Sequence, residues 1–294
     1  MGVRVVGQGS QRLGAWYAGN ARSLSFRATR DPWAVLVSEV MAQQTQAARA
    51  AEAWTRFMAL FPTPGSLAAA TPATVIREWR GLGYNRRAIA LRRAAMTIVE
   101  EHGGNVPDTV EALIALPGIG PYTARAVLAI AFGKPVAALD VNIRRVVGRA
   151  FLPPTIAPRD VQAAADALVP LDRAADWTHA LMDIGAAFCG PRQPRCDVCP
   201  LQATCRFGLS GGARTATRTA ARTAANRPAP VRFESTSRWL RGRILDRLRD
   251  AEGWITFEDA IGAHDSKAVH ESIAKLAAEG MIELVDGRAR LGIG

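Results

Sequence analysis

The sequence has almost no lysine and no long apolar run. Only three lysines occur among 294 residues, against 34 arginines, and Lys134 is the only lysine before residue 267. Chemistry that needs an amine nucleophile therefore has almost no candidate in most of the chain. No apolar run approaches the roughly 18 to 20 residues that span a bilayer, and the first residues lack the apolar segment of a signal peptide. We therefore expect neither membrane insertion nor secretion, and a cytoplasmic location.

The composition predicts a soluble, folded protein. Hydrophobic residues make up 49% of the chain and charged residues 21%, which is typical of neither a disordered nor a collagen-like protein. The length corresponds to two domains at roughly 100 to 200 residues each. Nothing in the sequence requires more than a monomer.

The charge is positive and unevenly distributed. The formal net charge is +11; residues 1–205 carry 22 basic and 15 acidic side chains, and residues 206–232 carry six arginines and no acid. Residues 235–294 are nearly balanced, with nine basic and ten acidic side chains. The positive net charge of the whole chain favours a polyanion as partner, because arginines that neutralise phosphates release counterions. The alternative is a compositional drift toward arginine that raises the charge without any ligand.

Three regions separate by pattern. Residues 1–207 read as a succession of short helices with almost no strand, which predicts an all-α domain. Residues 208–234 are rich in Gly, Ala, Thr and Arg and are predicted to be a basic flexible linker. Residues 235–294 predict two helices and two short strands about Asp286-Gly287, the order of a small winged-helix-like α/β domain.

A tight glycine turn joins two predicted helices. Asp108 and Glu111 predict the start of the first helix, which ends before the sequence Pro117-Gly118-Ile119-Gly120, and a second helix follows from residue 121. Gly118 and Gly120 let the backbone approach a ligand, and the following helix N-terminus offers free N–H groups to a phosphate. The alternative is a plain αα-hairpin that binds nothing.

The cysteines form one local cluster. All four lie within seventeen residues with the spacing C-x6-C-x2-C-x5-C, at Cys189, Cys196, Cys199 and Cys205. In a chain without a secretion signal, such a set indicates a metal site before it indicates disulfides. Zinc and a four-iron cluster both accept four thiolates.

Four segments and this cysteine spacing together resemble one family. The segments are SEVMAQQTQ around Glu39, GLGYNRRA, the helix-hairpin-helix sequence LPGIGPYTA, and LDVNIRRV with Asp140. Over about residues 12–207 the chain is similar to the adenine DNA glycosylase (MutY) branch of the endonuclease III superfamily. The resemblance implies a helix-hairpin-helix DNA glycosylase fold and an iron–sulfur (4Fe–4S) cluster in the loop at 189–205. It also implies double-stranded DNA with a mispaired or damaged base as the partner, and association with the nucleoid.

The resemblance also implies roles for two acids. Breaking an N-glycosidic bond builds positive charge on the sugar and needs a less anionic leaving base, which are separate tasks for two carboxyl groups. By similarity, ionised Asp140 stabilises the sugar cation and protonated Glu39 donates to adenine N7. Without the resemblance, Asp140 would be interpreted as a helix N-cap and Glu39 as an exposed helix carboxylate.

The remaining site residues are also implied by the resemblance. Tyr122 and Asn142 are expected to support the sugar and Asp140. Members of the superfamily that nick the strand carry a Schiff-base lysine at the position of Tyr122, so we predict a monofunctional glycosylase. The residues expected to contact DNA are Gln43, Gln44, Tyr84, Gly118, Gly120, Arg22 and Arg27, with Gln44 and Tyr84 wedging into the duplex beside the extruded base.

The sequence departs from the family at several positions. Phe26, Ala42 and Val141 replace residues usual near the pocket or the wedge, and His179 stands where relatives often present an amide or carboxylate. About 60 residues after the linker are too few for the Nudix-like domain that commonly inspects 8-oxoguanine in this family. For this short C-terminal domain we expect packing on the glycosylase body or binding of a protein partner.

Excision of adenine mispaired with 8-oxoguanine or guanine is therefore the function expected from the sequence. One alternative keeps the fold and changes the base, giving a uracil or thymine glycosylase at G mismatches. A second alternative is a non-catalytic DNA-binding regulator, against which the pair of acids argues, since binding alone needs neither.

Overall fold

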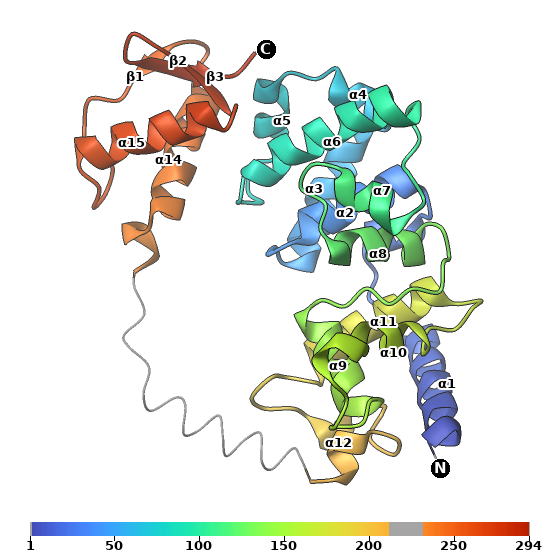
Figure 1. The fold of residues 1–294 in the computed structure, drawn as a ribbon. Coiled ribbons are helices and arrows are strands. Elements are labelled where there is room, and N and C mark those ends of the chain that lie inside the picture. Colours follow the sequence, from blue (N-terminus) through green and yellow to red (C-terminus); the bar gives the residue numbers. More distant parts are fainter. Residues whose placement is uncertain (1, 212–231, 294) are drawn as a thin grey trace.

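The fold consists of two helical lobes and a small C-terminal domain (Figure 1). It is a computed structural model that describes residues 2–211 and 232–293. The linker predicted at 208–234 falls mostly on residues 212–231, which lie outside the described residues. No helix among the described residues combines the length and apolar character that crossing a membrane requires.

The first lobe contains the central helices of the chain. Its elements are η1 (Ser25–Ala28), α2 (Pro32–Ala42), α3 (Ala47–Leu60), α4 (Pro64–Ala68), α5 (Pro72–Glu78), α6 (Arg86–His102), α7 (Val110–Ala115) and α8 (Pro121–Ile130). Their apolar faces enclose one core in which Phe57, Trp79 and Leu91 are buried. Burying such large side chains stabilises the fold by about 1.5 to 3 kcal/mol each, before the entropy cost is counted.

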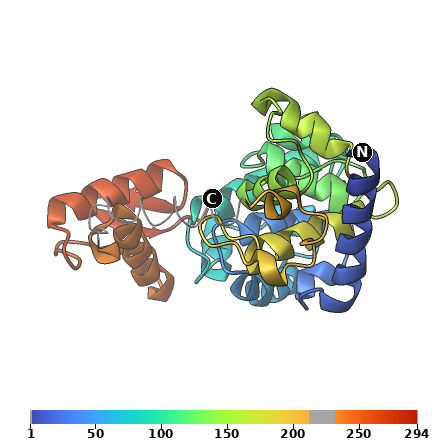
Figure 2. The ribbon, with the colours of Figure 1, turned by 90° about the horizontal axis from the view of Figure 1, so that it is seen from below.

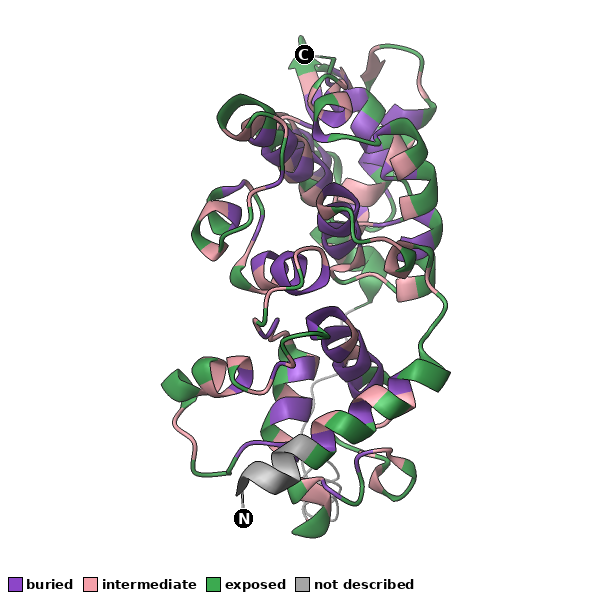
Figure 3. Cartoon of the chain, turned by 90° about the vertical axis from the view of Figure 1, so that its right-hand side faces the viewer, coloured by how far each residue is buried: buried purple, intermediate pink, exposed green. Residues whose placement is uncertain are grey.

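The second lobe is built from the first helix of the chain and from the helices that follow α8. Its elements are α1 (Gly2–Asn20), α9 (Val141–Ala150), η2 (Pro158–Asp160), α10 (Val161–Asp166), α11 (Ala174–Ala187), η3 (Cys196–Val198) and α12 (Arg206–Leu209). Leu13, Val147 and Trp177 are buried in its separate core. Buried positions of both lobes lie on the helix faces turned toward their neighbours (Figure 3). The predicted all-α, helix-hairpin-helix architecture is thus confirmed for the described residues before the linker.

Local chemistry sets where the helices begin. Thr71 caps α5, as its sequence predicts. Helix α7 starts one residue later than predicted, because Thr109 Oγ1 accepts from the backbone N–H of Ala112 at 3.3 Å. Asp108 instead pairs with Lys134, whose Nζ lies 2.8 Å from its carboxylate. The prediction that Asp108 caps the start of this helix is therefore wrong.

The C-terminal domain combines two helices with a three-stranded sheet. Its elements are η4 (Phe233–Ser235), α14 (Ser237–Asp250), β1 (Ile255–Thr256), α15 (Ser266–Ala278), β2 (Ile282–Val285) and β3 (Arg288–Leu291). The strands are antiparallel in the order β1-β3-β2. Asp286 and Gly287 adopt positive φ angles of 47° and 75°, which confirms the predicted hairpin turn. Strand β1 has only two residues, too few to give an alternating pattern in the sequence.

The C-terminal domain packs on α5, and the ion pair of Glu279 with Arg86 joins it to the start of α6 (Figures 1 and 2). Leu240 and Ile244 of α14 are buried in the same core as the first lobe. Arg249 donates to the carbonyl of Ile76 at 3.0 Å and to Asn85 Oδ1 at 2.9 Å. Of the two roles expected for this domain, the structure therefore shows packing on the body of the protein.

Candidate active site

Three of the predicted site residues meet between the two lobes. Glu39 lies on α2, Tyr122 in the first turn of α8, and Asp140 directly before α9. The Tyr122 ring packs against the cores of both lobes. Burial raises the pKa of Tyr122 well above its ordinary value, and the negative charges of Glu39 and Asp140 raise it further. The two acids therefore face one shared site beside this tyrosine.

Glu39 is a buried acid that can hold a proton near neutral pH. Only 7% of its surface is exposed, which excludes the exposed helix carboxylate considered above. Burial raises its pKa from 4.5 to about 7; a hydrogen bond from Tyr122 opposes this, and the charge of Asp140 adds to it. A carboxyl group with this pKa is matched to proton donation at the pH of a cell.

Asp140 caps α9 and is held by three N–H donors. Its Oδ1 accepts from the backbone of Asn142 at 2.9 Å and of Ile143 at 2.6 Å, and its Oδ2 accepts from Asn142 Nδ2 at 3.1 Å. The N-cap interpretation is thus correct, and it does not compete with a chemical role. The cap fixes both oxygens, and the positive end of α9 lies next to their negative charge.

Asn142 is itself fixed from two sides. Its Oδ1 accepts from Arg145 Nη2 at 2.9 Å, and the same nitrogen donates to the carbonyl of Gly185 on α11 at 3.2 Å. A Cβ at Gly185 would lie 3.2 Å from Asn142 Cβ, so the glycine lets α11 come close to α9. This arrangement keeps the Asn142 amide pointed at Asp140.

In the glycine turn before α8, one glycine is required by the packing and the other has open space beside it. Gly118 has φ 79°, and a Cβ there would lie 2.7 Å from Ala90 Cβ. Gly120 is extended and is the N-cap of α8, and a Cβ there would meet no atom within 4 Å among the described residues. The open space at Gly120 lets a phosphate approach the first N–H groups of α8.

The two residues expected to wedge into DNA both have a left-handed backbone. Gln44 has φ 55° and Tyr84 has φ 46°, and together with Asp286 they are the described non-glycine residues with positive φ. This conformation is unfavourable for ordinary side chains and marks functional turns. Gln43, the residue before the first turn, donates from Nε2 to Thr123 Oγ1 of α8 at 3.1 Å.

Arg87 holds these two turns together. Its Nη1 donates to the carbonyls of Val40 at 2.6 Å and Met41 at 3.1 Å, at the end of α2. Its Nη2 donates to the carbonyls of Leu82 at 3.1 Å and Gly83 at 3.0 Å, in the turn before α6. Burial lowers the pKa of Arg87 to about 10. One guanidinium therefore satisfies carbonyls from both turns, as helix ends require.

We expect the substitution Arg87→Ala to loosen both turns. Removing the guanidinium leaves four carbonyls without this donor, and we expect the free energy of unfolding to fall by about 3 kcal/mol. Urea unfolding measures this change. The matched control is Arg92→Ala, because Arg92 Nε serves a single carbonyl, that of Ala70. Equal losses for the two variants would contradict the bridging role.

Arg27 lies inside the protein rather than on its surface. Its side chain is 7% exposed, and it donates to both oxygens of Asp183 on α11 at 2.8 and 2.9 Å. Arg22, whose side chain is 43% exposed, donates to the same carboxylate from Nε at 2.5 Å. The predicted DNA contact by Arg27 is therefore not supported by its burial, whereas Arg22 remains accessible. The positive charge of Arg27 instead lowers the pKa of Glu39.

Asp183 is a site residue that the sequence reasoning missed. It is 3% exposed; burial alone would raise its pKa, but the hydrogen bonds and charges of the two arginines lower it overall. The signal in the sequence was its place four residues after His179, which puts both on one face of α11. His179 is buried, and burial lowers its pKa to about 3, so the ring is neutral at pH 7.

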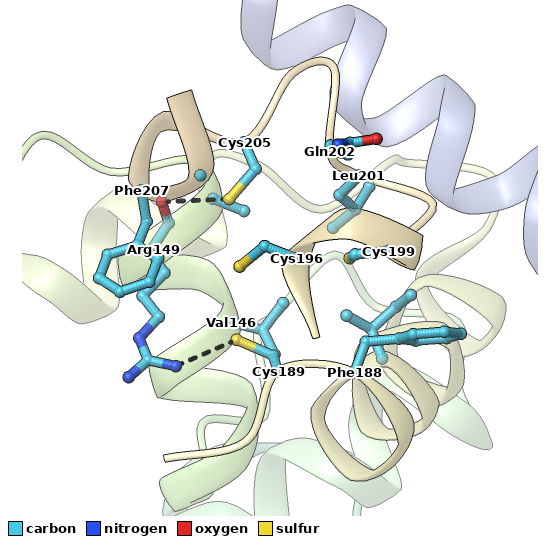
Figure 4. Close-up of a pocket in the computed structure, with 13 residues that line it drawn as sticks. Val146, Arg149, Phe188, Cys189, Cys196, Cys199, Leu201, Gln202, Cys205 and Phe207 are labelled. Atoms are coloured by element: carbon cyan, nitrogen blue, oxygen red, sulfur yellow. Dashed lines mark hydrogen bonds between the residues drawn. The ribbon is translucent and has the colours of Figure 1, made fainter. Parts of the chain in front are cut away.

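The four cysteines surround one cavity beside α9 (Figure 4). The cavity is lined by Cys189, Cys196, Cys199 and Cys205. All four are free thiols, so disulfides are absent from this cluster. Arg149 of α9 donates to Cys189 Sγ at 3.5 Å. Burial raises the pKa of Cys199 to about 11, and the other three sulfurs add to this effect.

This donor set fits a bound inorganic group. Four cysteine sulfurs are suitable ligands for a soft metal ion or an iron–sulfur cluster, and an arginine N–H donor to sulfur is usual around such clusters. Among the described residues, no group of His, Cys, Asp and Glu side chains converges tightly enough for a single ion. Cys189, Cys196, Cys199 and Cys205 are the residues that would hold such an inorganic group.

A buried acid, a helix-capping aspartate and a glycine turn at the N-terminus of α8 together define a helix-hairpin-helix DNA glycosylase. The chain belongs to the HhH-GPD superfamily of base excision DNA repair proteins, whose family model matches residues 37–171, and within it to the adenine DNA glycosylase branch. It is 38% identical to the adenine DNA glycosylase of Mycolicibacterium smegmatis, with 94% of each chain covered. It is 39% identical to that of Mycobacterium tuberculosis H37Rv, covering 94% of this chain and 91% of the relative.

A solved structure of a thermostable thymine-DNA glycosylase has a similar fold. Its TM-score is 0.66 at 27% identity, and the match covers 70% of this chain and 98% of that chain. The mycobacterial relatives match over a longer stretch, 94% of this chain, and so carry counterparts of most of the C-terminal domain. This domain is thus shared with close relatives, although it departs from the Nudix-like pattern.

Proposed function

We propose that the protein excises adenine paired with 8-oxoguanine or guanine in double-stranded DNA and leaves an abasic site. The observation that supports this most is the pairing of a buried, protonatable Glu39 with a fixed Asp140 across Tyr122. Adenine carries a basic ring nitrogen, so a buried proton donor is the group that its departure needs. The mycobacterial relatives are adenine DNA glycosylases, which agrees with this base.

In this mechanism each acid has one task. Glu39 donates its proton to the departing adenine, so that the base leaves as a neutral molecule. Asp140 places its fixed negative charge under the sugar ring, where positive charge develops as the bond breaks. Asn142 and the start of α9 hold this carboxylate in place before the reaction, which avoids reorganisation at the transition state.

We propose that the protein does not nick the DNA strand through an imine. Tyr122 occupies the first turn of α8, and a phenol cannot form a Schiff base. Lys134, the only lysine among the first 266 residues, pairs with the carboxylate and the carbonyl of Asp108. Its amine is therefore engaged elsewhere.

Incubation with four duplexes tests the substrate. The duplexes carry A opposite 8-oxoguanine, A opposite G, U opposite G, or T opposite G, and alkali cleavage after incubation reveals abasic sites. We expect product from the two adenine duplexes and none without alkali. Processing of uracil or thymine but not adenine would overturn the proposal, and cleavage of none of the duplexes would favour a regulator that only binds DNA.

We further propose that the four cysteines hold a 4Fe–4S cluster. A cluster bound there cross-links the loop at 189–205 through four thiolates and fixes its fold. Arg149 supports the loop directly, donating to the carbonyls of Gly190 at 2.8 Å and Pro191 at 3.0 Å. This loop and α9, which is capped by Asp140, are thus held to each other.

We expect anaerobically purified protein to be brown and to contain about four iron atoms per chain. The variant Cys199→Ser should lose more than half of this iron and unfold at a lower temperature, as measured by iron analysis and circular dichroism. Thr204→Ala is the matched control: Thr204 is buried in the same loop and bonds the carbonyl of Leu201. A colourless protein that contains zinc would contradict the iron assignment.

A further inference from the structure

A basic cleft lies between the C-terminal domain and the catalytic lobes. It holds about 430 Å³ of space that water can enter, and it opens to solvent. The body contributes Gln43, Gln44, Tyr84, Asn85, Arg86 and Arg87, and the C-terminal domain contributes Ser237, Arg238, Arg241, Gly242 and Leu245. Four arginines therefore line a cleft that also contains both turns expected to wedge into DNA. Nothing in the function proposed above uses the C-terminal half of this lining.

One face of α14 forms the far wall of the cleft. Its lining residues recur at positions separated by three, four and seven residues, so they share a face of the helix. Arg241 is partly neutralised by Glu279, which directly follows α15 and also pairs with Arg86. Arg238 is exposed, and a Cβ at Gly242 would meet no atom within 4 Å among the described residues. A ligand can thus approach this face closely near Arg238.

Arg238 couples this wall directly to the wedge. Its guanidinium carbon lies 4.0 Å from the centre of the Tyr84 ring, and its Nη1 donates to Tyr84 Oη at 2.8 Å. The Tyr84 side chain remains 39% exposed. A guanidinium carries five N–H donors in a planar fork, which suits bidentate contact with a phosphate. Arg238 is therefore placed to contact a DNA backbone while it stacks on Tyr84.

The position of the wedge determines which strand reaches the cleft. Gln43 bonds Thr123 of α8 on the side of the active site, and the same residue lines the cleft on the other side. When a nucleotide leaves the duplex toward Tyr122, the wedge fills its place in the stack. The complementary strand then lies beyond the wedge, on the side of Arg238.

From this geometry we infer that the cleft between α14 and the turns at Gln44 and Tyr84 binds the backbone of the DNA strand opposite the extruded nucleotide. Arg238 is its main phosphate contact. The inference rests on the proposed function, since it takes Tyr122 and Glu39 to mark the side that the nucleotide enters. The C-terminal domain is nearly neutral overall, so its contact with DNA depends on where it packs on the body of the protein and not on its net charge.

A binding experiment on the full-length protein tests this inference. The probe is a 30-base-pair duplex with A opposite 8-oxoguanine, bound by protein carrying Glu39→Gln so that turnover does not interfere. In that background, Arg238→Ala should weaken binding by about tenfold, the value of one hydrogen bond to a charged group. The slope of log Kd against log salt should fall by about one, since one phosphate contact is lost.

Neutral methylphosphonates then identify the strand. Placed near the mispair in the strand opposite adenine, they should weaken binding by the Glu39→Gln protein about tenfold and have little further effect on the Arg238→Ala variant. Placed in the adenine strand, they should weaken both proteins equally. The assignment of Arg238 to the opposite strand is wrong if Arg238→Ala removes the effect of methylphosphonates in the adenine strand instead. It is also wrong if Arg238→Ala removes the effect in neither strand.

The matched control is Arg247→Ala. Arg247 is an exposed arginine of α14 nine residues after Arg238, which places it on the opposite face of the helix. Its loss should leave both Kd and the salt slope unchanged, whereas losses equal to those of Arg238→Ala would indicate general charge attraction and overturn the inference. The test measures binding alone, so a failure of adenine excision in the wild type would refute the proposed function separately.

Discussion

The substitution Asp140→Asn is expected to reduce the single-turnover rate of adenine excision by about 10² to 10³-fold while leaving the protein folded. The amide keeps the shape of the carboxylate and caps a helix as well as Asp does, so the N–H groups of Asn142 and Ile143 stay satisfied. What is lost is the negative charge next to the developing sugar cation, and preorganised groups of this kind are worth about 10² to 10³ each. Quenched-flow or manual single-turnover assays give the rate, and thermal unfolding gives the stability.

A matched control separates charge from structure. Asp166 is a second carboxylate that holds a backbone N–H, that of Ala137 at 2.8 Å, and it also pairs with Arg125 of α8 at 2.8 Å. Asp166→Asn should lower stability, because it weakens this ion pair, and should change the excision rate by less than about threefold. If Asp140→Asn retained full activity, or if both variants lost activity equally, the assignment of Asp140 to the sugar cation would be wrong.

Local sequence patterns predicted the features that depend on neighbouring residues. The cysteine spacing predicted a thiol cluster, and all four thiols line one cavity. The turn at Asp286 and Gly287 follows from the left-handed preference of those residue types. The glycine turn before α8 was visible for the same reason, since Gly118 needs both a positive φ and the space beside Ala90.

The burial of Glu39 depends on packing that the sequence does not display. All residues from Trp33 to Met41 are buried, so α2 has no polar face from which its orientation could be deduced. The carboxyl group is buried on α2, which packs against α8, and those contacts join segments that are far apart in the sequence. The resemblance to a family therefore supplied an assignment that periodicity alone could not.

Arginines were the hardest residues to assign from sequence. Arg27, Arg87 and Arg249 are largely buried and bind carbonyls or a carboxylate, yet each occurs in a polar-looking segment that predicts a surface position. Their partners are remote in the chain, and arginine can satisfy several acceptors at once from a long flexible stem. In a protein with 34 arginines, net charge therefore overstates the surface available for DNA.

The second large effect is expected at Glu39. The pKa of about 7 implies that the excision rate of the wild type is constant below pH 7 and falls tenfold per pH unit well above it, because only the protonated acid can donate. Glu39→Gln removes the proton donor and should lower the rate at pH 7 by about 10² to 10⁴. Single-turnover rates between pH 5 and 9 measure both effects. A wild-type rate that rises with pH through 7 would contradict the role of Glu39 as an acid.

The same substitution should stabilise the protein at alkaline pH, which distinguishes a chemical role from a structural one. The unfolded-state pKa is near 4.5 and the folded-state value is about 7, so between these values the folded state binds the additional proton. Stability of the wild type therefore decreases as pH rises from 4.5 and levels off above 7. Glutamine is never charged. The free energy of unfolding of the Glu39→Gln variant, relative to that of the wild type, should therefore increase by about 3 kcal/mol between pH 4.5 and 8. Urea unfolding at these two pH values measures this difference, and a stability gap that does not change with pH would show that Glu39 is not desolvated in the folded protein.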